Sequence, residues 1–363
     1  MVILKKAYIL ILTASLTLFT VQCKKEIKKA SFVVIFASNQ STVMRGSEKI
    51  VAAPGLVLLE NDQIVTRDGT LDIQTSNGSA LRIRPFSTVR LTSLGSERGS
   101  VVDLQGGSLM ANVEKNREGF TVVMPTSIAS VRGTTFSAEV GEGSTVKVLN
   151  GSVEMQPRIP ALEKLTHEQL MNNPALKEVV QMMESQHIVL EEKSEGLISP
   201  QIAAQLEKLN TQIERMQPGA TLAAPVPQAA LSSHTSDVTP QEEAEAATLV
   251  TVDAALINSA AAESAPAARK ALESKISEEH QTHLNQAITV IENKAAERGL
   301  KTEKEIQSYY NVLEVIVMRD GSKNSGAVVA QAGDVIVLHT VKGVFRVNKE
   351  QVDYIDYFHT QNR

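Results

Sequence analysis

The sequence predicts a multidomain chain with an all-β domain, a central α-helical region and a small C-terminal β-barrel. Three observations support this order. Short runs of alternating apolar and polar residues fill positions 62–155, apolar residues at helical spacing follow capping residues between 160 and 310, and strand-like runs return after 311. A chain of 363 residues is also long enough for two or three domains.

The N-terminus predicts export and a lipid anchor. Lys5 and Lys6 precede an apolar run, 7–21, that is shorter than the roughly 20 residues of a membrane-spanning helix. Cys23, the only cysteine of the chain, follows directly, and the residues before it resemble the relaxed lipoboxes of spirochaetal lipoproteins. We therefore expect residues 1–22 to be a lipoprotein signal peptide and Cys23 to carry acyl chains such as palmitate. The alternative is an uncleaved anchor with an incidental thiol.

Residues 23–45 are expected to form a tether between this anchor and the first folded domain. Four lysines within it can interact with anionic lipid at about 1 kcal/mol each, which supports membrane attachment without specifying a protein partner. Lys24, directly after the cysteine, favours the outer membrane, on its periplasmic or surface face.

Composition limits the classes of function. The net charge of -5 argues against a nucleic-acid partner, because phosphate binding needs a clustered basic surface. Aromatic residues make up 4% of the chain and Trp is absent, which argues against recognition of sugars or bases by stacking. No nucleophile–base or paired-carboxylate arrangement stands out, so we expect no enzyme activity and no cofactor.

The first β-patterned block is predicted to be an all-β domain over residues 46–158. Strand-like runs alternate with turn signals at Asp68-Gly69 and Asn77-Gly78, dipeptides that tolerate the positive φ angles of tight hairpin turns. No run in the block is long or periodic enough for a helix.

Recurrent phrases in this block point to a known family. Asp62-Gln63-Ile64-Val65-Thr66 opens the series, and a longer phrase from Phe120 to Val140 closes it. In these phrases the block resembles the FecR domain of envelope proteins, which include the periplasmic half of iron-siderophore signal transducers. The positions that carry the motif are Asp62, Gly78, Pro125, Gly133, Thr134, Phe136 and Gly151.

The motif residues are expected to be architectural. Gly133 is predicted at a bend between strands where a side chain would collide, and Phe136 and Val148 are predicted to fill the core. The expected anchor at Cys23, the two β modules and the lack of a catalytic arrangement favour a non-enzymatic envelope protein that binds another envelope protein or peptidoglycan. The alternative is a signalling component related to the iron-siderophore transducers.

Residues 160–217 are predicted to form a helical hairpin. Thr166 and Gln169 form a capping box, and Asn173-Pro174 starts a helix that is expected to continue to Gly196. A further helix starts at Ser199-Pro200, and its apolar residues from Ile202 to Met216 recur at coiled-coil spacing. This apolar seam either packs within the hairpin or joins two copies of the chain.

The next segments are predicted to be an Ala/Pro-rich mobile linker over 218–264, with a marginal helix in 241–262, and then a helix over 265–310. His280 and His283 lie on that helix. Two imidazoles alone do not make a metal site, which needs three or four ligands, so we expect exposed histidines and no metal. A metal-dependent hydrolase using this pair is the enzymatic alternative.

Residues 311–360 are predicted to form a small SH3-like or Sm-like β-barrel. Five short apolar runs are joined by tight turns such as Asp320-Gly321, Gly333-Asp334 and Lys342-Gly343. Such barrels bind peptides or pack against partner proteins.

Overall fold

The computed structural model describes residues 31–38, 41–96, 99–115, 119–216, 222, 227 and 229–357. Cys23 and the predicted signal peptide lie outside these residues. Within them, no helix combines the length and the apolar character needed to cross a membrane.

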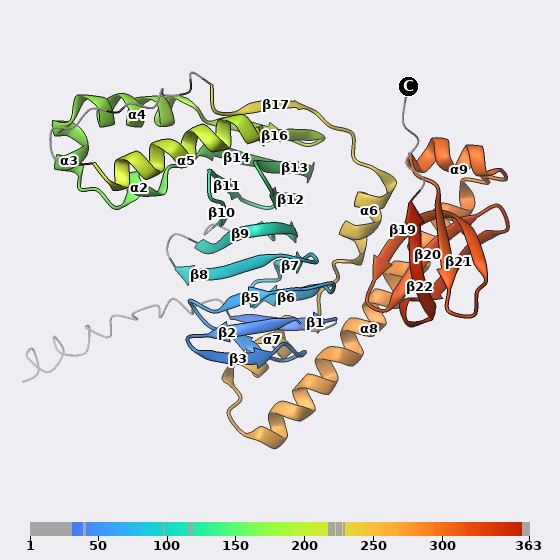
Figure 1. Ribbon diagram of the computed structural model, residues 1–363. Helices are drawn as coiled ribbons and strands as arrows, with labels where there is room; N and C mark the ends of the chain where they lie inside the picture. Colours follow the sequence, from blue (N-terminus) through green and yellow to red (C-terminus); the bar gives the residue numbers. More distant parts are fainter. Residues whose placement is uncertain are drawn as a thin grey trace, which may run out of the picture.

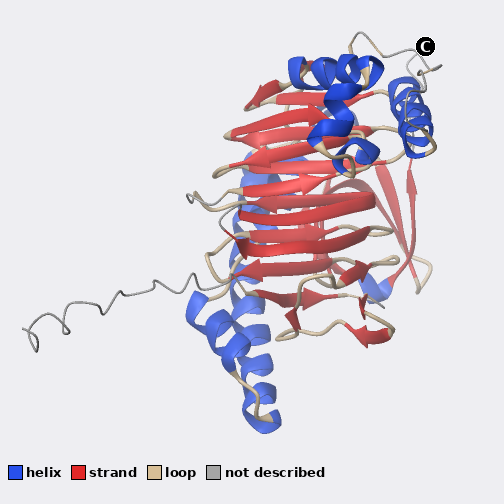
Figure 2. Ribbon diagram, turned by 90° about the vertical axis from the view of Figure 1, so that its left-hand side faces the viewer, coloured by secondary structure: helices blue, strands red, loops and turns tan. Residues whose placement is uncertain are grey.

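Two sheets stacked face to face form a β-sandwich (Figures 1 and 2). Sheet A contains, in spatial order, β4 (Val57–Leu58), β1 (Phe32–Ala37), β6 (Leu71–Thr75), β7 (Ala80–Ile83), β9 (Gly99–Asn112), β12 (Thr135–Val140), β13 (Ser144–Asn150), β16 (Ser194–Ile198) and β17 (Ser232–Thr235). Sheet B contains β3 (Glu48–Val51), β2 (Thr42–Arg45), β5 (Gln63–Val65), β8 (Thr88–Ser96), the first half of β9, β10 (Phe120–Val123), β11 (Ser127–Val131), β14 (Ser152–Pro157) and β15 (Ile188–Glu191).

Strand β9 crosses from sheet B to sheet A, and Gly107 lies at the crossing. Its φ of +80° belongs to the left-handed region, and a Cβ there would lie 2.6 Å from the carbonyl oxygen of Phe86. Only glycine satisfies both conditions without strain. The core between the sheets is built from inward-facing residues of the alternating strands, and Phe136 and Val148, which were predicted to fill it, are both fully buried.

Strands β1 and β2 correct the expectation that residues 23–45 form a tether. Phe32 and Val34 of β1 point into the sandwich core, whereas Val33 and Ile35 point the other way and are equally buried. A strand buried on both faces is a continuous apolar run rather than an alternating one, which is why the strand pattern of the sequence did not mark it.

Helices α2 (Pro160–Glu163), α3 (His167–Asn172), α4 (Pro174–Ser185) and α5 (Pro200–Glu214) cover one end of the sandwich (Figure 1). The capping box of Thr166 and Gln169 is present. Leu206, Leu209 and Ile213 of α5 pack into the core of the sandwich, so this apolar seam is buried within the chain.

Residues 188–198 correct the prediction that the helix starting at Asn173 continues to Gly196. Helix α4 ends at Ser185, and the following residues form a hairpin, β15 and β16, that extends both sheets. Leu190 is buried in this hairpin, and Lys193 adopts a φ of 60° in its turn. Leu190 therefore belongs to a strand that adds to the sandwich core.

Much of the predicted linker 218–264 is structured, which corrects its description as mobile. Residues 237–252, named here the strap, contain α6 (Pro240–Thr248) and run along the outer face of sheet A. Helix α7 (Ala254–Ala262) follows, and its Ile257 is fully buried against β1. The outer face of sheet A supplies the apolar surface and hydrogen bonds that order this Ala-rich segment, which its composition alone does not reveal.

Helix α8 (Pro266–Glu297) links the sandwich to a second sheet, and α9 (Glu303–Tyr310) follows it (Figure 1). The second sheet, named here the C-terminal sheet, has the order β21 (Gly343–Asn348), β20 (Val335–Thr340), β19 (Lys323–Ala332), β18 (Glu314–Met318) and β22 (Val352–Tyr357). Among the described strands, no pairing joins β21 to β22, so the predicted closed barrel is wrong and the sheet is open. Leu284 and Ile288 of α8 cover one face of it, which buries apolar residues that a closed barrel would enclose.

Candidate functional site

A ladder of polar contacts holds the strap to the outer face of sheet A. At one end, the Lys147 ammonium group donates to the carboxylate of Glu242 at 2.7 Å and to the carbonyl oxygen of Asp237 at 2.9 Å. At the other, the side-chain amide of Gln74 donates to the carbonyl oxygen of Val252 and accepts from its N–H, at 2.8 and 2.7 Å. Such paired bonds fix the position of the strap along the sheet.

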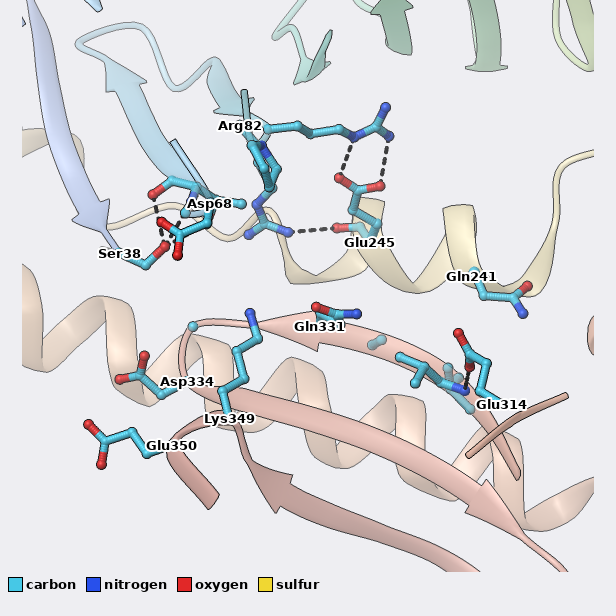
Figure 3. A pocket seen from close by; sticks show the side chains of 18 of the residues that line it. Ser38, Asp68, Arg82, Gln241, Glu245, Glu314, Gln331, Asp334, Lys349 and Glu350 are labelled. Carbon is cyan, nitrogen blue, oxygen red and sulfur yellow. Dashed lines mark hydrogen bonds and ion pairs between the residues drawn. The ribbon is translucent and has the colours of Figure 1, made fainter. Parts of the chain in front are cut away.

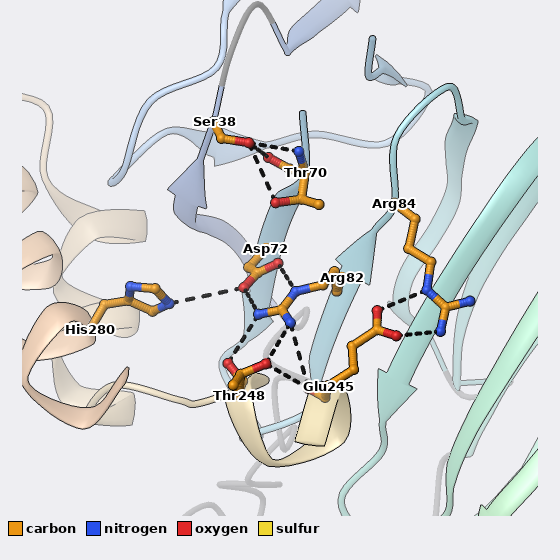
Figure 4. Close-up of polar contacts among 8 residues, drawn as sticks. All are labelled: Ser38, Thr70, Asp72, Arg82, Arg84, Glu245, Thr248 and His280. Carbon is orange, nitrogen blue, oxygen red and sulfur yellow. Dashed lines mark hydrogen bonds and ion pairs between the residues drawn. The ribbon is translucent and has the colours of Figure 1, made fainter. Parts of the chain in front are cut away.

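Two arginines of β7 and its following turn make the central contacts of this ladder. The Arg84 guanidinium forms two parallel hydrogen bonds with Glu245, at 2.8 and 2.7 Å. Arg82 donates to the hydroxyl and to the carbonyl oxygen of Thr248, at 2.8 and 3.0 Å (Figure 4). Paired bonds to a planar guanidinium combine charge with fixed geometry, so α6 is held in one orientation.

Arg82 also neutralises a buried carboxylate. Asp72 of β6 accepts two hydrogen bonds from Arg82, at 2.9 and 2.7 Å, and His280 of α8 lies 4.0 Å from the same carboxylate. The Nε2 atom of His280 is buried and has no hydrogen-bond partner among the described atoms, and its ring stacks on Phe36. Burial lowers the pKa of His280, and Arg82 and His283 lower it further, whereas Asp72 acts in the opposite direction.

A cleft of about 660 Å³ lies between the sandwich, the strap and the C-terminal sheet (Figure 3). The sandwich contributes Arg82, Arg84 and the turn around Gly69, the strap contributes Gln241 and Glu245, and the C-terminal sheet contributes Glu314, Gln331 and Lys349. This volume is typical of sites for small ligands, which often form where two structural units meet.

Two ionisable side chains of the C-terminal half line the cleft and have shifted pKa values. Lys349 lies on the short 3₁₀ turn Lys349–Gln351, and burial, followed by the charge of Arg82, lowers the pKa of its ammonium group. Glu314 is 5% exposed, and burial raises the pKa of its carboxyl group although the N–H of Val328 donates to it at 2.6 Å. In both groups, burial disfavours the charged form relative to the neutral one.

Ser38 and Thr70 line the cleft beside the turn around Gly69. Ser38 exchanges hydrogen bonds with the backbone of Thr70, which occupies its hydroxyl (Figure 4). Across the part of the chain that the structure describes, no group of three or more His, Cys, Asp or Glu side chains is arranged to hold a metal ion.

The structure corrects the expectation that His280 and His283 are exposed. His280 is 2% exposed, and His283 is partly buried with its Nδ1 atom 2.6 Å from the carbonyl oxygen of Thr251. The helix on which they lie has a polar sequence, but it passes between the sandwich and the C-terminal sheet, so its histidines are covered by β1 and by the segment that precedes α7.

Asp62 and Gly78, the first two motif residues, lie in the sandwich away from the cleft. The Asp62 carboxylate is 1% exposed and accepts two hydrogen bonds from Arg45, at 2.9 and 2.7 Å, and a third from the N–H of Leu59. Gly78 has a φ of +94° in the turn between β6 and β7.

The remaining motif residues also lie away from this cleft. A Cβ on Gly133 would lie 2.9 Å from the Cβ of Lys115, and a Cβ on Gly151 would lie 2.9 Å from the carbonyl oxygen of Gly133. The Thr134 hydroxyl donates to the carbonyl oxygen of Ser152 at 2.7 Å. Pro125 lines a separate cavity beside α5, of about 580 Å³. Sequence reasoning found the framework but not the cleft, whose residues come from segments far apart in the chain.

Comparison with known proteins identifies the central strands. Residues 62–154 match the sequence model of the family described as FecR protein. This segment is a FecR domain. It covers about a quarter of the chain, from β5 to β14. Strands β1 to β4, the hairpin of β15 and β16, the strap and the C-terminal sheet therefore lie outside the matched residues.

Two crystal structures of candidate anti-sigma factors from Parabacteroides distasonis are similar to part of the chain. The first is 15% identical, with a TM-score of 0.29, and the similarity covers 38% of this chain and 55% of that one. The second is 11% identical, also with a TM-score of 0.29, and covers 48% of this chain and 85% of that one. The chain thus spans about half the length of the first of them. No curated protein sequence matches it.

Proposed function

We propose that this chain is a cell-envelope signalling component in which the FecR domain, the strap and the C-terminal sheet act together as a binding module. The observation that carries the proposal is the FecR domain at residues 62–154, a domain of regulatory rather than enzymatic proteins. The cleft beside it has the size and the mixed polarity of a ligand site and is lined by residues of all three parts.

The strap provides the physical coupling that signalling requires. Arg82 lines the cleft and at the same time binds Thr248 of the strap, and Arg84 binds Glu245. A ligand that changes the hydrogen bonds of either arginine would change how firmly the C-terminal half is held to the FecR domain. Binding and docking of the two halves therefore share the same side chains, which is a condition for energetic coupling between sites.

The proposed location is the cell envelope, with attachment through lipid on Cys23. Three features of the N-terminal sequence support it: the basic start, the apolar run of 7–21 and the single cysteine that follows. FecR domains are themselves associated with the envelope. The outer membrane is the favoured site because Lys24 follows the cysteine.

The proposal is tested by transcript profiling of a deletion strain complemented with matched variants. Glu245→Lys places a second cation against Arg84 and is expected to reproduce the deletion phenotype. Glu243→Lys makes the same change two positions away on α6, at an exposed residue, and is expected to restore the wild-type profile. Immunoblots confirm equal protein levels.

An unchanged transcript profile in the deletion strain would contradict a signalling role. The second candidate function, an interaction module that binds an envelope protein or peptidoglycan without signalling, would then be preferred. Crosslinked envelopes would distinguish it, because a specific partner should be recovered with the wild type and with Glu243→Lys.

A further inference from the structure

We propose that the cleft binds a small zwitterionic ligand of the amino-acid or short-peptide class, with its carboxylate at Lys349 and its ammonium group at Glu314. Both residues line the cleft, and among the described residues neither forms an ion pair. Binding at this site goes beyond the signalling role proposed above and does not depend on it.

Lys349 is a cation held in place without an anion. The backbone N–H of Lys349 donates to the carbonyl oxygen of Asp334 at 2.8 Å. The side chain of Asn348 caps the turn on which Lys349 lies. Across the described residues, no carboxylate lies within 4.0 Å of its ammonium group, although Asp334 and Asp72 are near enough to influence its pKa. The other cations of the inner wall, Arg82 and Arg84, are already paired.

Glu314 is the opposite case, an anion without a cation. Its carboxylate accepts one hydrogen bond, from the N–H of Val328, and among the described residues no lysine, arginine or histidine forms an ion pair with it. A buried charge in this state is costly unless a group of opposite charge also binds it. Glu314 therefore offers a site for an ammonium group.

Glu314 lies on β18 and Lys349 on the turn between β21 and β22, and Gln331 lies between them in the view of Figure 3. A ligand with a carboxylate at one end and an ammonium group at the other satisfies both. The side-chain amides of Gln331 and Gln241 can then donate to, or accept from, the polar atoms between its two ends. A ligand with a single charge would leave either the partly buried Lys349 or the buried Glu314 unpaired.

The test is calorimetric titration of the full chain, purified in detergent, with alanine and with dialanine to tetra-alanine. The length series separates an amino acid from a peptide ligand. We expect saturable binding of at least one member, weakened about tenfold or more when its carboxylate is amidated or its amine is acetylated.

Two variants assign the ends of the ligand. In Lys349→Met, amidation of the ligand should no longer lower its affinity, because the cation that binds the carboxylate is removed. In Glu314→Gln, which keeps an acceptor for the Val328 N–H, acetylation of the ligand should no longer lower its affinity. Lys342→Met and Glu303→Gln are exposed controls that should bind like the wild type. Absence of saturable binding throughout the series, or equal sensitivity of Lys349→Met and wild type to amidation, would overturn the proposal. Neither result bears on the transcript test above.

Discussion

Asp72 and Arg82 lie directly opposite each other on β6 and β7 and form an ion pair in which both carboxylate oxygens accept a hydrogen bond. Their side chains are 0% and 5% exposed. Other donors of the guanidinium bind the hydroxyl and the carbonyl oxygen of Thr248 and, at 3.5 Å, the carbonyl oxygen of Glu245, both on the strap. One arginine thus neutralises a buried carboxylate within the FecR domain and fixes a segment that lies 166 positions away in sequence.

Replacing Arg82 with Met should destabilise the protein strongly. The substitution leaves the buried Asp72 carboxylate unpaired, a change that typically costs about 3–5 kcal/mol in free energy of unfolding. Urea unfolding followed by circular dichroism would measure it. Arg90→Met on β8 removes the same group from an exposed position and should change the free energy of unfolding by no more than about 0.5 kcal/mol. Equal effects of the two variants would refute the role given to the pair.

The stability of the protein should fall as the pH drops through and below about 6.5. Burial lowers the pKa of His280 below its ordinary value of 6.5, and burial also lowers the pKa of His339. The unfolded chain therefore binds more protons than the folded chain in this range, and protonation favours unfolding. His280→Gln should flatten the dependence of the unfolding free energy on pH between about 6.5 and 5.

The slope left in that variant is assigned to His339, so the double variant with His339→Gln should be flatter still. His187→Gln is the control, because this histidine is exposed and its ring stays in water in both states. If the unfolding free energy of His280→Gln depends on pH as steeply as that of the wild type, protonation of His280 does not contribute to the pH dependence of stability.

Gly133→Ala should destabilise the FecR domain by about 1–3 kcal/mol. Its φ of +90° lies in the left-handed region, and the new Cβ would lie 2.9 Å from the Cβ of Lys115. Gly141→Ala is the matched control, since nothing lies within 4 Å of the Cβ it would add. Thermal unfolding of both variants would measure the difference. Equal stability of Gly133→Ala and Gly141→Ala would show that a side chain at position 133 causes no strain.

Cutting the chain between α5 and the strap should not separate its two halves. A sequence-specific protease site that replaces residues 223–226 would allow the cut in the purified protein. Contacts from α7 and α8 to β1, together with the four contacts of the ladder, should keep the fragments together in size-exclusion chromatography. Elution as two separate species without denaturant would mean that the strap is weakly held.

Cys23→Ser should move the protein from the detergent phase to the aqueous phase and abolish acyl labelling. Two or three acyl chains hold a protein on a membrane because each buried CH₂ contributes about 0.8 kcal/mol. Gln22→Ala keeps the cysteine and should stay in the detergent phase. Unchanged partition of Cys23→Ser would instead indicate an uncleaved apolar segment.

Local sequence signals predicted the elements that depend on neighbouring residues. Alternating strands and glycine turns outlined the FecR domain, and the capping groups of Thr166 and Asn173 begin helices as expected. These features depend on residues a few positions apart, so the sequence carries them directly.

Elements that depend on distant partners were missed. Residues 32–37 form a strand buried on both faces because α7 and α8 cover their outer face, and Ala-rich residues 240–262 are ordered because they pack on sheet A. The cleft was missed for the same reason. Lys349, Glu314 and Arg82 carry no local motif, and only the tertiary fold brings them to one site.

The docking of α7 and α8 on β1 has a consequence for how the chain matures. During synthesis β1 is made long before the residues that cover its outer face. Val33 and Ile35 pack against Ile257 and Ile276, and Gln74 bonds to Val252, which lies 178 positions later in the chain. Until those residues are synthesised, the apolar outer face of β1 is exposed to solvent and prone to aggregation. We therefore expect slow folding, limited by the formation of these long-range contacts.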